Sequence, residues 1–286
     1  MTEHADPGRG SRILGDLWRG GDGKRSVWIA VVSTVVFAAL FVLVVVTSPG
    51  WHEVKKSFFN RKIFVQSLPD ISHAFLLNVR IFLTAEAFIL VFALLIAVLR
   101  GLPGPVFFPI RALAVIYTDF FRGVPTILVI YILGFGAPAL QLSWLEWTTP
   151  LFWGTLSLVL VYSAYVAEVY RAGIESVHTS QEAAARSLGL SRFKTLRYVI
   201  VPQAVRRVIP PLLNDFIGLT KDTALVAFLG PIEAFRQSQL DVGATFNYTP
   251  YMCAALLFIL LTVPLARFTD WLIARERKRQ LAGGAR

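Results

Sequence analysis

The sequence predicts an all-α, polytopic membrane protein with about six transmembrane helices. Of its 286 residues, 55% are hydrophobic and only 16% are charged, which is more apolar surface than a soluble domain of this size needs to bury. Uncharged runs cover residues 27–47, 147–167 and 246–266. A helix needs about 20 apolar residues to cross the hydrocarbon core of a bilayer, and each of these runs is long enough. A membrane is therefore the simplest solvent for this chain.

Three further stretches bring the number of predicted spans to six. Residues 124–145 form a fourth uncharged run, whereas the apolar stretches 75–99 and 208–220 are interrupted. Arg80 and Glu86 interrupt the first of them, and two prolines interrupt the last. Neighbouring helices and side chains can satisfy the backbone groups that a proline frees, so these interruptions do not exclude membrane spans.

A helix break is expected at residues 122–125. The helix that begins near Val106 should end there, because Pro125 lacks an amide donor and biases Val124 away from the helical conformation. A break at membrane depth is tolerated only where it is buried in protein or lines a water-filled path. An ordinary loop at the membrane interface is the alternative.

The net charge of +10 is compatible with a nucleic-acid partner, so the placement of the charge decides its meaning. With the N-terminus inside, 20 of the 28 Lys and Arg residues fall in the segments 1–26, 100–111, 171–207 and 267–286. This asymmetry follows the positive-inside rule and predicts that both termini are cytoplasmic. The basic outer loop 51–70 runs against the rule. The distribution favours a membrane protein and argues against nucleic acid.

The longest polar interruption of the apolar sequence falls at 176–202, on the predicted cytoplasmic side. Thr179 and Glu182 have the spacing of a capping box, in which Thr179 accepts the amide of Glu182 and Glu182 reaches back to Thr179. The three alanines that follow favour a helix, and Gly189 can end it in a left-handed turn. A short helix is therefore expected in this loop.

Charged side chains inside the predicted spans are candidates for a path or a gate. A charge near the bilayer centre costs about 2.5–3.5 kcal/mol on insertion scales, so it normally faces protein or water. Tyr165, Glu168 and Arg171 lie three residues apart, so Glu168 and Arg171 can pair, either as a structural element or as a gate. Arg80 and Glu86 are about 120° apart around a helix and cannot pair simply. Either both side chains line a path, or the charged end of Arg80 extends to the membrane interface and Glu86 forms a hydrogen bond with another helix.

No pattern in the sequence predicts catalysis or metal binding. A phosphate-binding loop needs Gly-x-x-x-x-Gly-Lys-Ser/Thr, whereas the Gly23-Lys24 pair has Trp18 in the first glycine position and Arg25 after the lysine. The four histidines are scattered without the spacing of metal ligands. We therefore expect no catalytic residue, no metal and no cofactor in this chain.

Five stretches, taken together and in their order, resemble the permeases that import polar amino acids within the ATP-binding cassette (ABC) superfamily. They hold an aromatic-Arg-Gly-x-Pro segment, a Tyr-x-x-Glu-x-x-Arg signature, an alanine triplet followed by Gly189 and Pro202, two proline-containing pieces of the next helix, and a Lys-Asp-Thr-Ala-Leu ending. These stretches cover 117–125, 163–173, 181–202, 202–215 and 221–225. The resemblance extends over residues 73–268.

The polar loop departs from the family pattern at its acid. The Glu that opens the family's Glu-Ala-Ala motif falls on Ala183, and Glu182 stands one place earlier. Residues 178–180 replace the usual Pro-Lys-Gly, and Val124 stands where Thr is usual. Glu182 therefore either takes part in docking a partner or only starts the helix.

The resemblance implies the type I ABC importer permease fold for residues 73–268. Together with the composition and charge of the remaining residues, it divides the chain into four segments. These are a cytosolic tail, an N-terminal transmembrane helix, a permease core with a cytoplasmic coupling loop at 176–202, and a basic cytosolic tail, at 1–26, 27–47, 73–268 and 269–286. The helix at 27–47 is too long and too poorly ended for a cleaved signal peptide, so we expect it to be retained.

The resemblance and the charges within the predicted spans indicate two sets of functional residues. The coupling loop is the part of such a permease that an ATPase subunit grips, and its expected residues are Gln181, Glu182, Ala183, Ala184, Ala185, Arg186 and Gly189. An amino-acid zwitterion offers a carboxylate to an arginine and an ammonium to a glutamate. The candidates for a substrate path or gate are Arg80, Glu86, Arg122, Glu168, Arg171, Asn214 and Lys221.

The resemblance implies a membrane-spanning permease subunit of an ATP-driven amino-acid importer, which forms the translocation path and couples it to a separate ATPase subunit. The partners that the resemblance implies are a dimer of ABC ATPase subunits, a second permease chain that is identical or related, an extracytoplasmic solute-binding protein, and the lipid of a bacterial inner membrane. ATP and Mg²⁺ would bind to the ATPase, and this chain would not be an enzyme. The alternatives are a secondary carrier and a membrane subunit that senses or anchors without transport.

Overall fold

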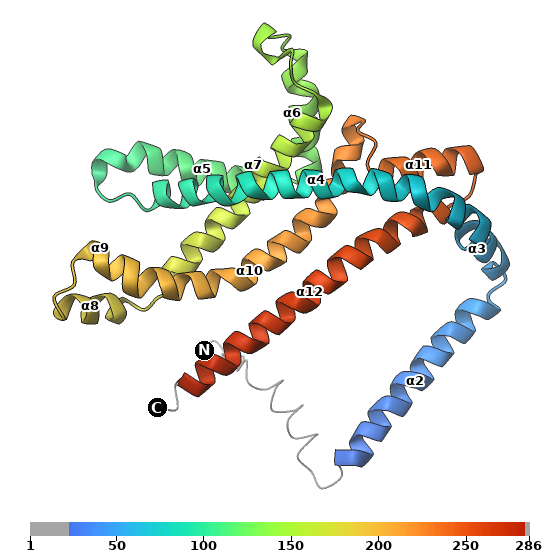
Figure 1. The fold of residues 1–286 in the computed structure, drawn as a ribbon, viewed down its shortest axis with the longest axis horizontal. Helices are drawn as coiled ribbons and strands as arrows, with labels where there is room; N and C mark the ends of the chain where they lie inside the picture. Colours follow the sequence, from blue (N-terminus) through green and yellow to red (C-terminus); the bar gives the residue numbers. More distant parts are fainter. Residues whose placement is uncertain (1–22, 284–286) are drawn as a thin grey trace, which may run out of the picture. The chain divides into compact units, whose positions relative to one another are not determined.

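A computed structural model describes residues 23–283, and this part of the chain consists of helices and their connections, without a strand (Figure 1). Most of the predicted N-terminal tail and the end of the predicted C-terminal tail lie outside the described residues. The chain divides into two compact units, Met1–Ser57 and Phe58–Arg286.

The described part of the first unit contains α2 (Gly23–Thr47) and nearly all of α3 (Trp51–Phe58). The apolar part of α2, Ser26–Thr47, is long enough to cross a membrane, and none of it is buried inside the protein. A helix that is apolar all round and has no protein cover is suited to lipid. The predicted helix at 27–47 thus forms, and it has spanning length.

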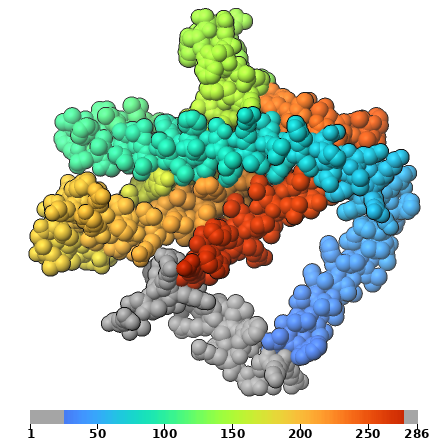
Figure 2. All heavy atoms as spheres, viewed as in Figure 1, coloured from blue at the N-terminus to red at the C-terminus, as the bar shows by residue number. Residues whose placement is uncertain are grey.

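The second unit begins with a 40-residue helix and continues through eight further helices. They are α4 (Arg61–Arg100), α5 (Phe108–Gly123), α6 (Thr126–Ala139), α7 (Pro150–Glu175), α8 (Thr179–Ser187), α9 (Arg192–Thr195), α10 (Val201–Asp222), α11 (Ala234–Thr245) and α12 (Thr249–Gly283). A π-helical turn joins α9 to α10, and a 3₁₀ segment, Thr223–Leu229, follows α10. Helices α8 and α9 lie at one end of this unit and α11 at the other (Figures 1 and 2).

Helix α7 forms the centre of the second unit, because it packs against α4, α5, α6 and α10. The buried residues of α4 recur every three or four positions, as in Ile81, Ala85 and Ile89, which is the period of one helical face. These side chains meet Leu158 and Val161 of α7 in the main apolar core. Helix α12 packs against α4, α10 and α11.

Two helices of this unit, α4 and α7, begin with a side-chain cap. The side chain of Asn60 accepts hydrogen bonds from the amides of Lys62 and Ile63 at the start of α4. Thr149 accepts the amide of Phe152 at the start of α7, and proline occupies the first helical position there. Both caps satisfy amides that a helix leaves free at its N-terminus.

The predicted helix break lies between α5 and α6. Val124 has extended backbone angles, and the axes of the two helices differ by 107°. Pro125 stands immediately before α6, where its missing amide removes no hydrogen bond from the helix. The break that the proline predicts is therefore confirmed, and it separates one short helix from another.

Among the described residues, α2, α4, α7 and α12 contain segments long and apolar enough to cross a membrane, and the bent pair α5 and α6 supplies a fifth candidate. Helix α10 has 22 residues, which is sufficient length, but Asn214 and Asp215 and other polar side chains make it too polar to be recognised by composition. Counted by length, α10 brings the candidate spans within residues 23–283 to six, the number that the sequence predicts. The polar side chains of α10 need to be covered by neighbouring helices.

Candidate functional site

The polar loop forms a short helix, α8, at the predicted place, but its N-terminal cap is not the predicted one. Thr179 already has a helical backbone, so the cap position falls on His178, whose ring Nδ1 accepts the amide of Ser180 at 3.2 Å. The capping box of Thr179 and Glu182 was therefore a wrong prediction. Glu182 remains exposed in the first turn of α8, where its negative charge interacts favourably with the positive end of the helix dipole.

The C-terminus of α8 follows the prediction. Gly189 has a φ of 81°, which is left-handed. The amide of Leu190 donates to the carbonyl of Ala185 at 3.2 Å, and the amide of Gly189 donates to the carbonyl of Arg186 at 2.9 Å. This pair of hydrogen bonds is a Schellman motif, and it fixes the chain direction at the end of the helix.

The outer surface of α8 is open. Ala185 is the buried residue of this helix, and Gln181, Ala183, Ala184 and Arg186 are exposed. Two large apolar side chains extend the surface, because Leu188 is 84% exposed and Phe193 of α9 is 69% exposed. Apolar side chains this exposed next to small residues form a surface suited to a protein partner.

The inner side of α8 contacts the π-helical segment Leu196–Ile200, which leads into α10. Val177, Ile200 and Ala204 form a small buried apolar cluster beside it. A cleft of about 500 Å³ runs between α8 and the end of α4, and its lining includes Gly101 and Glu182. The short helix therefore packs against the core on its inner side.

Near α8, Glu168 of α7 binds arginines from three helices. Its carboxylate lies 2.8 Å from Arg100 of α4 and 3.9 Å from Arg122 of α5, and it also bonds Arg171 one turn further along α7. Arg100 also donates to the hydroxyl of Thr118 at 3.1 Å. We call Glu168 with Arg100, Arg122 and Arg171 the arginine cluster. Bonds between ionised groups are stronger than neutral ones, so the cluster ties α4, α5 and α7 together.

The predicted pair of Glu168 and Arg171 is present, but the sequence analysis missed Arg100. Arg100 lies 68 residues before Glu168, and it counted only as one of the cytoplasmic charges. Arg122, which was a separate candidate, also belongs to the cluster. One sequence signal could have identified Arg100 as a candidate: it lies at the end of a predicted span, beside the turn at Gly101.

The arginine cluster is connected to α8 through the last turn of α7. Arg171 also bonds Glu175, and Arg207 of α10 donates to the backbone carbonyl of Ser176. Between them, Gly173 allows α10 to approach closely, because a Cβ at this position would lie 2.1 Å from Cγ2 of Val208. These contacts hold the last turn of α7, which leads into α8, against α10.

The remaining path candidates lie apart from this cluster. Arg80 lines an open pocket of about 450 Å³ with His73. Glu86 is buried on the same helix, and the two side chains do not pair. Asn214 and Lys221 are seven residues apart on α10, so they share one face of that helix, and both are exposed.

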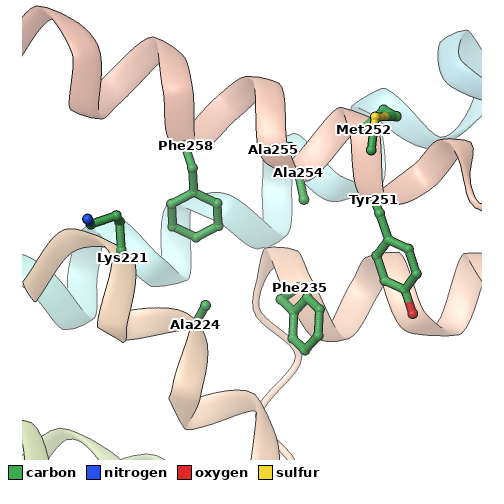
Figure 3. Close-up of a pocket in the computed structure, with 8 residues that line it drawn as sticks. All are labelled: Lys221, Ala224, Phe235, Tyr251, Met252, Ala254, Ala255 and Phe258. Atoms are coloured by element: carbon green, nitrogen blue, oxygen red, sulfur yellow. The ribbon is translucent and has the colours of Figure 1, made fainter. Parts of the chain in front are cut away.

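Lys221 borders a separate pocket. Its volume is about 630 Å³, and the lining comes from α10, the following 3₁₀ segment, α11 and α12. Figure 3 shows the rings of Phe235, Tyr251 and Phe258 along it, with Lys221 at one end. Lys221 is the charged member of this otherwise apolar lining.

A buried polar network, which the sequence analysis also missed, anchors α11 to α4. The amide nitrogen of the Asn78 side chain donates to Glu233 at 2.8 Å and to Thr223 at 3.1 Å, and its oxygen accepts the amide of Ala234 at 3.0 Å. Glu233 also caps α11. Burial raises the pKa of Glu233, although hydrogen bonds from the amides of Phe235 and Arg236 and from Asn78 oppose this shift.

The helical core, its bent fifth span and the exposed short helix define a polytopic transport subunit. Residues 89–278 match the profile of the family described as "Binding-protein-dependent transport system inner membrane component". This match covers more than half of the chain, and the chain belongs to that family.

Relatives and solved structures agree with this assignment. The chain is 31% identical over 203 residues to "Probable amino-acid permease protein YxeN" of Bacillus subtilis, a match that covers 71% of this chain and 89% of the relative. It is 34% identical over 176 residues to "Probable glutamine ABC transporter permease protein GlnM" of the same organism, covering 60% of this chain and 79% of the relative.

Among solved structures, "an amino acid ABC transporter with histidines" superimposes with a TM-score of 0.68 at 28% identity, covering 74% of this chain and 96% of that chain. The inward-facing MetNI methionine ABC transporter superimposes with a TM-score of 0.57 at 16% identity, which concerns the fold alone. The predicted fold class, the type I ABC importer permease fold, is thereby confirmed, and the chain is a membrane-spanning permease subunit.

Proposed function

We propose that this permease subunit forms part of the translocation path of an ATP-driven amino-acid importer and receives mechanical work through α8. The observation that carries the proposal is the exposed helix α8, which ends at Gly189, contacts the π-helical segment that precedes α10, and is joined to α7 by three residues. The names of the relatives, which are amino-acid and glutamine permeases, support the substrate class.

In this proposal the ATPase is a separate subunit, present as a dimer, that binds ATP and Mg²⁺ and carries out hydrolysis. Its contact surface on this chain is the exposed side of α8, with Leu188 and Phe193 as apolar anchors and Ala183 and Ala184 as the close-approach surface. Arg186 provides a charged contact beside them. Apolar side chains at the centre of an interface typically contribute most of its binding energy.

The path itself requires a second permease chain, identical or related, beside this one. The exposed face of α10 with Asn214 and Lys221 is polar and has no cover from the described residues, which supports a position along that path. Substrate would arrive from an extracytoplasmic solute-binding protein. The distribution of Lys and Arg supports an inner-membrane topology with both termini in the cytoplasm.

The arginine cluster connects the docking surface to the path. A ligand shifts a conformational equilibrium only through contacts that differ between the two states. In this account, closure of the ATPase displaces α8, and the last turns of α7 and α10 transmit the displacement to Glu168 and its three arginines. The cluster thus acts as a gate that ties α4 and α5 to α7.

The proposal is tested by the change Leu188→Asp in the intact transporter. A charge in the apolar centre of the docking surface should lower amino-acid uptake and co-purification of the ATPase by about tenfold or more, since a desolvated unpaired charge costs several kcal/mol. Leu188→Met, which keeps the surface apolar, is the matched control and should retain both. Normal ATPase binding and uptake by Leu188→Asp would contradict the role of α8.

A further inference from the structure

Glu86 is a buried carboxyl group in a membrane-spanning helix. It lies on α4, is only 7% exposed, and its Oε1 atom has no hydrogen-bond partner among the described residues. Asp215 of α10 also has a buried oxygen, Oδ2, without such a partner. A buried carboxylate without a partner is costly, so two of them in one membrane domain need an explanation.

The two acids face the same contact between α4 and α10. Phe82, one turn before Glu86, packs edge to face against Phe216, which follows Asp215, with the ring centroids 5.7 Å apart. Helices α4 and α10 are in contact, and Glu86 and Asp215 both lie within about one turn of this aromatic pair. They therefore belong to one local site, with Phe82 and Phe216 as its apolar neighbour.

The basic residues of the core are engaged elsewhere. Arg80 is about 120° around α4 from Glu86 and lines the outer pocket with His73. Arg100 lies 14 residues, or about 21 Å, further along α4 and binds Glu168. Arg171 binds Glu168 and Glu175. None of these three arginines forms a hydrogen bond with the free oxygens of Glu86 and Asp215.

We infer that Glu86 and Asp215 form a binding site for a positively charged group of the transported molecule, and that the substrates are amino acids with a cationic side chain. The inference rests on the proposed transport function. Two carboxylates with free oxygens suit a guanidinium, which presents several donors in a plane, or an ammonium. A neutral side chain would leave the free carboxylate oxygens without a charged partner, and the two carboxylates would repel an acidic side chain.

The site is closed in this conformation, because both free oxygens are shielded from solvent. Separation of α4 and α10 at the Phe82 and Phe216 contact would open it. Such an opening fits a substrate site that is exposed to one side of the membrane at a time, since α10 follows directly on the π-helical segment that contacts α8. The cationic group would then replace the water that an open carboxylate pair binds.

The test measures uptake by the intact transporter, with its partner subunits, using labelled arginine, lysine, glutamine and glutamate. We expect transport of arginine or lysine in preference to the other two. Glu86→Gln and Asp215→Asn should each raise the KM for the cationic substrate by about tenfold or more, equal to about 1.4 kcal/mol. Glu146→Gln, an exposed Glu-to-Gln change in the outer connection, is the control and should leave KM unchanged.

The outcomes separate this inference from the function on which it rests. Uptake of glutamine or glutamate without arginine or lysine would overturn the inference and leave the amino-acid importer intact. Unchanged KM values for cationic substrates in both variants would also overturn it, and would indicate that the pair only shares a proton. If Glu86→Gln fails to assemble with the ATPase, Glu86→Asp and Asp215→Asn decide the question. Absence of any amino-acid uptake by the assembled wild type would refute the proposed function instead.

Discussion

The replacement Glu168→Gln tests the arginine cluster, because it removes one charge and almost no volume. Glutamine keeps one acceptor oxygen but no longer neutralises Arg100, which lies 2.8 Å away with a side chain only 15% exposed. Removal of one partner from a buried ion pair typically costs about 3–5 kcal/mol. The Glu168 side chain is 21% exposed, so water offsets part of this loss, and we expect destabilisation by about 2 kcal/mol.

For a domain of this size, about 2 kcal/mol corresponds to a fall in Tm of roughly 4–8 °C. The assay is thermal unfolding of the detergent-purified protein, followed by circular dichroism. Asp270→Asn is the control, because Asp270 and Arg267 form a well exposed pair at 3.5 Å on α12, and loss of such a pair costs little. Equal melting temperatures for Glu168→Gln, Asp270→Asn and the wild type would refute the stabilising role of the cluster.

Three further changes give distinct outcomes. Gly173→Val should lower stability by about 1–3 kcal/mol and reduce uptake per ATP hydrolysed, because its side chain would overlap Val208; thermal unfolding and paired uptake and ATPase assays check this. Gly189→Ala forces a side chain into a left-handed conformation at a cost of about 1–2 kcal/mol, so hydrogen exchange at the end of α8 should accelerate. Because burial raises the pKa of Glu233, this group contributes most to the free energy of unfolding at acid pH, and the contribution falls as the pH rises through the raised pKa. Glu233→Gln should therefore flatten the dependence of Tm on pH, whereas an unchanged pH profile would contradict the assignment.

Local features of the sequence were sufficient to predict much of the fold. The uncharged runs predict spanning helices, and Pro125 predicts the break between α5 and α6, because both depend on residues close together in the chain. Gly189 likewise predicts the end of α8. The cap of α8 was predicted wrongly, because the residue at which the backbone becomes helical depends on how the chain leaves α7.

The parts of the site that depend on distant residues were not predictable from one sequence. Glu168 and Arg171 share a helical stripe, so their pairing follows from spacing. Arg100 joins them from another helix, and its charge alone was indistinguishable from a topology signal. Asn78 and Glu233 are 155 residues apart, and no local pattern links them.

The central claim is that this permease subunit moves an amino acid with energy that reaches it from an ATPase through α8. The direct measurement is amino-acid uptake into proteoliposomes that contain this chain, its partner permease and the ATPase, with the solute-binding protein present on the side from which substrate enters. The account predicts accumulation that requires both ATP and the ATPase subunit, and that falls by about tenfold or more in Leu188→Asp. Uptake driven by an ion gradient in vesicles without the ATPase would identify a secondary carrier and contradict the account.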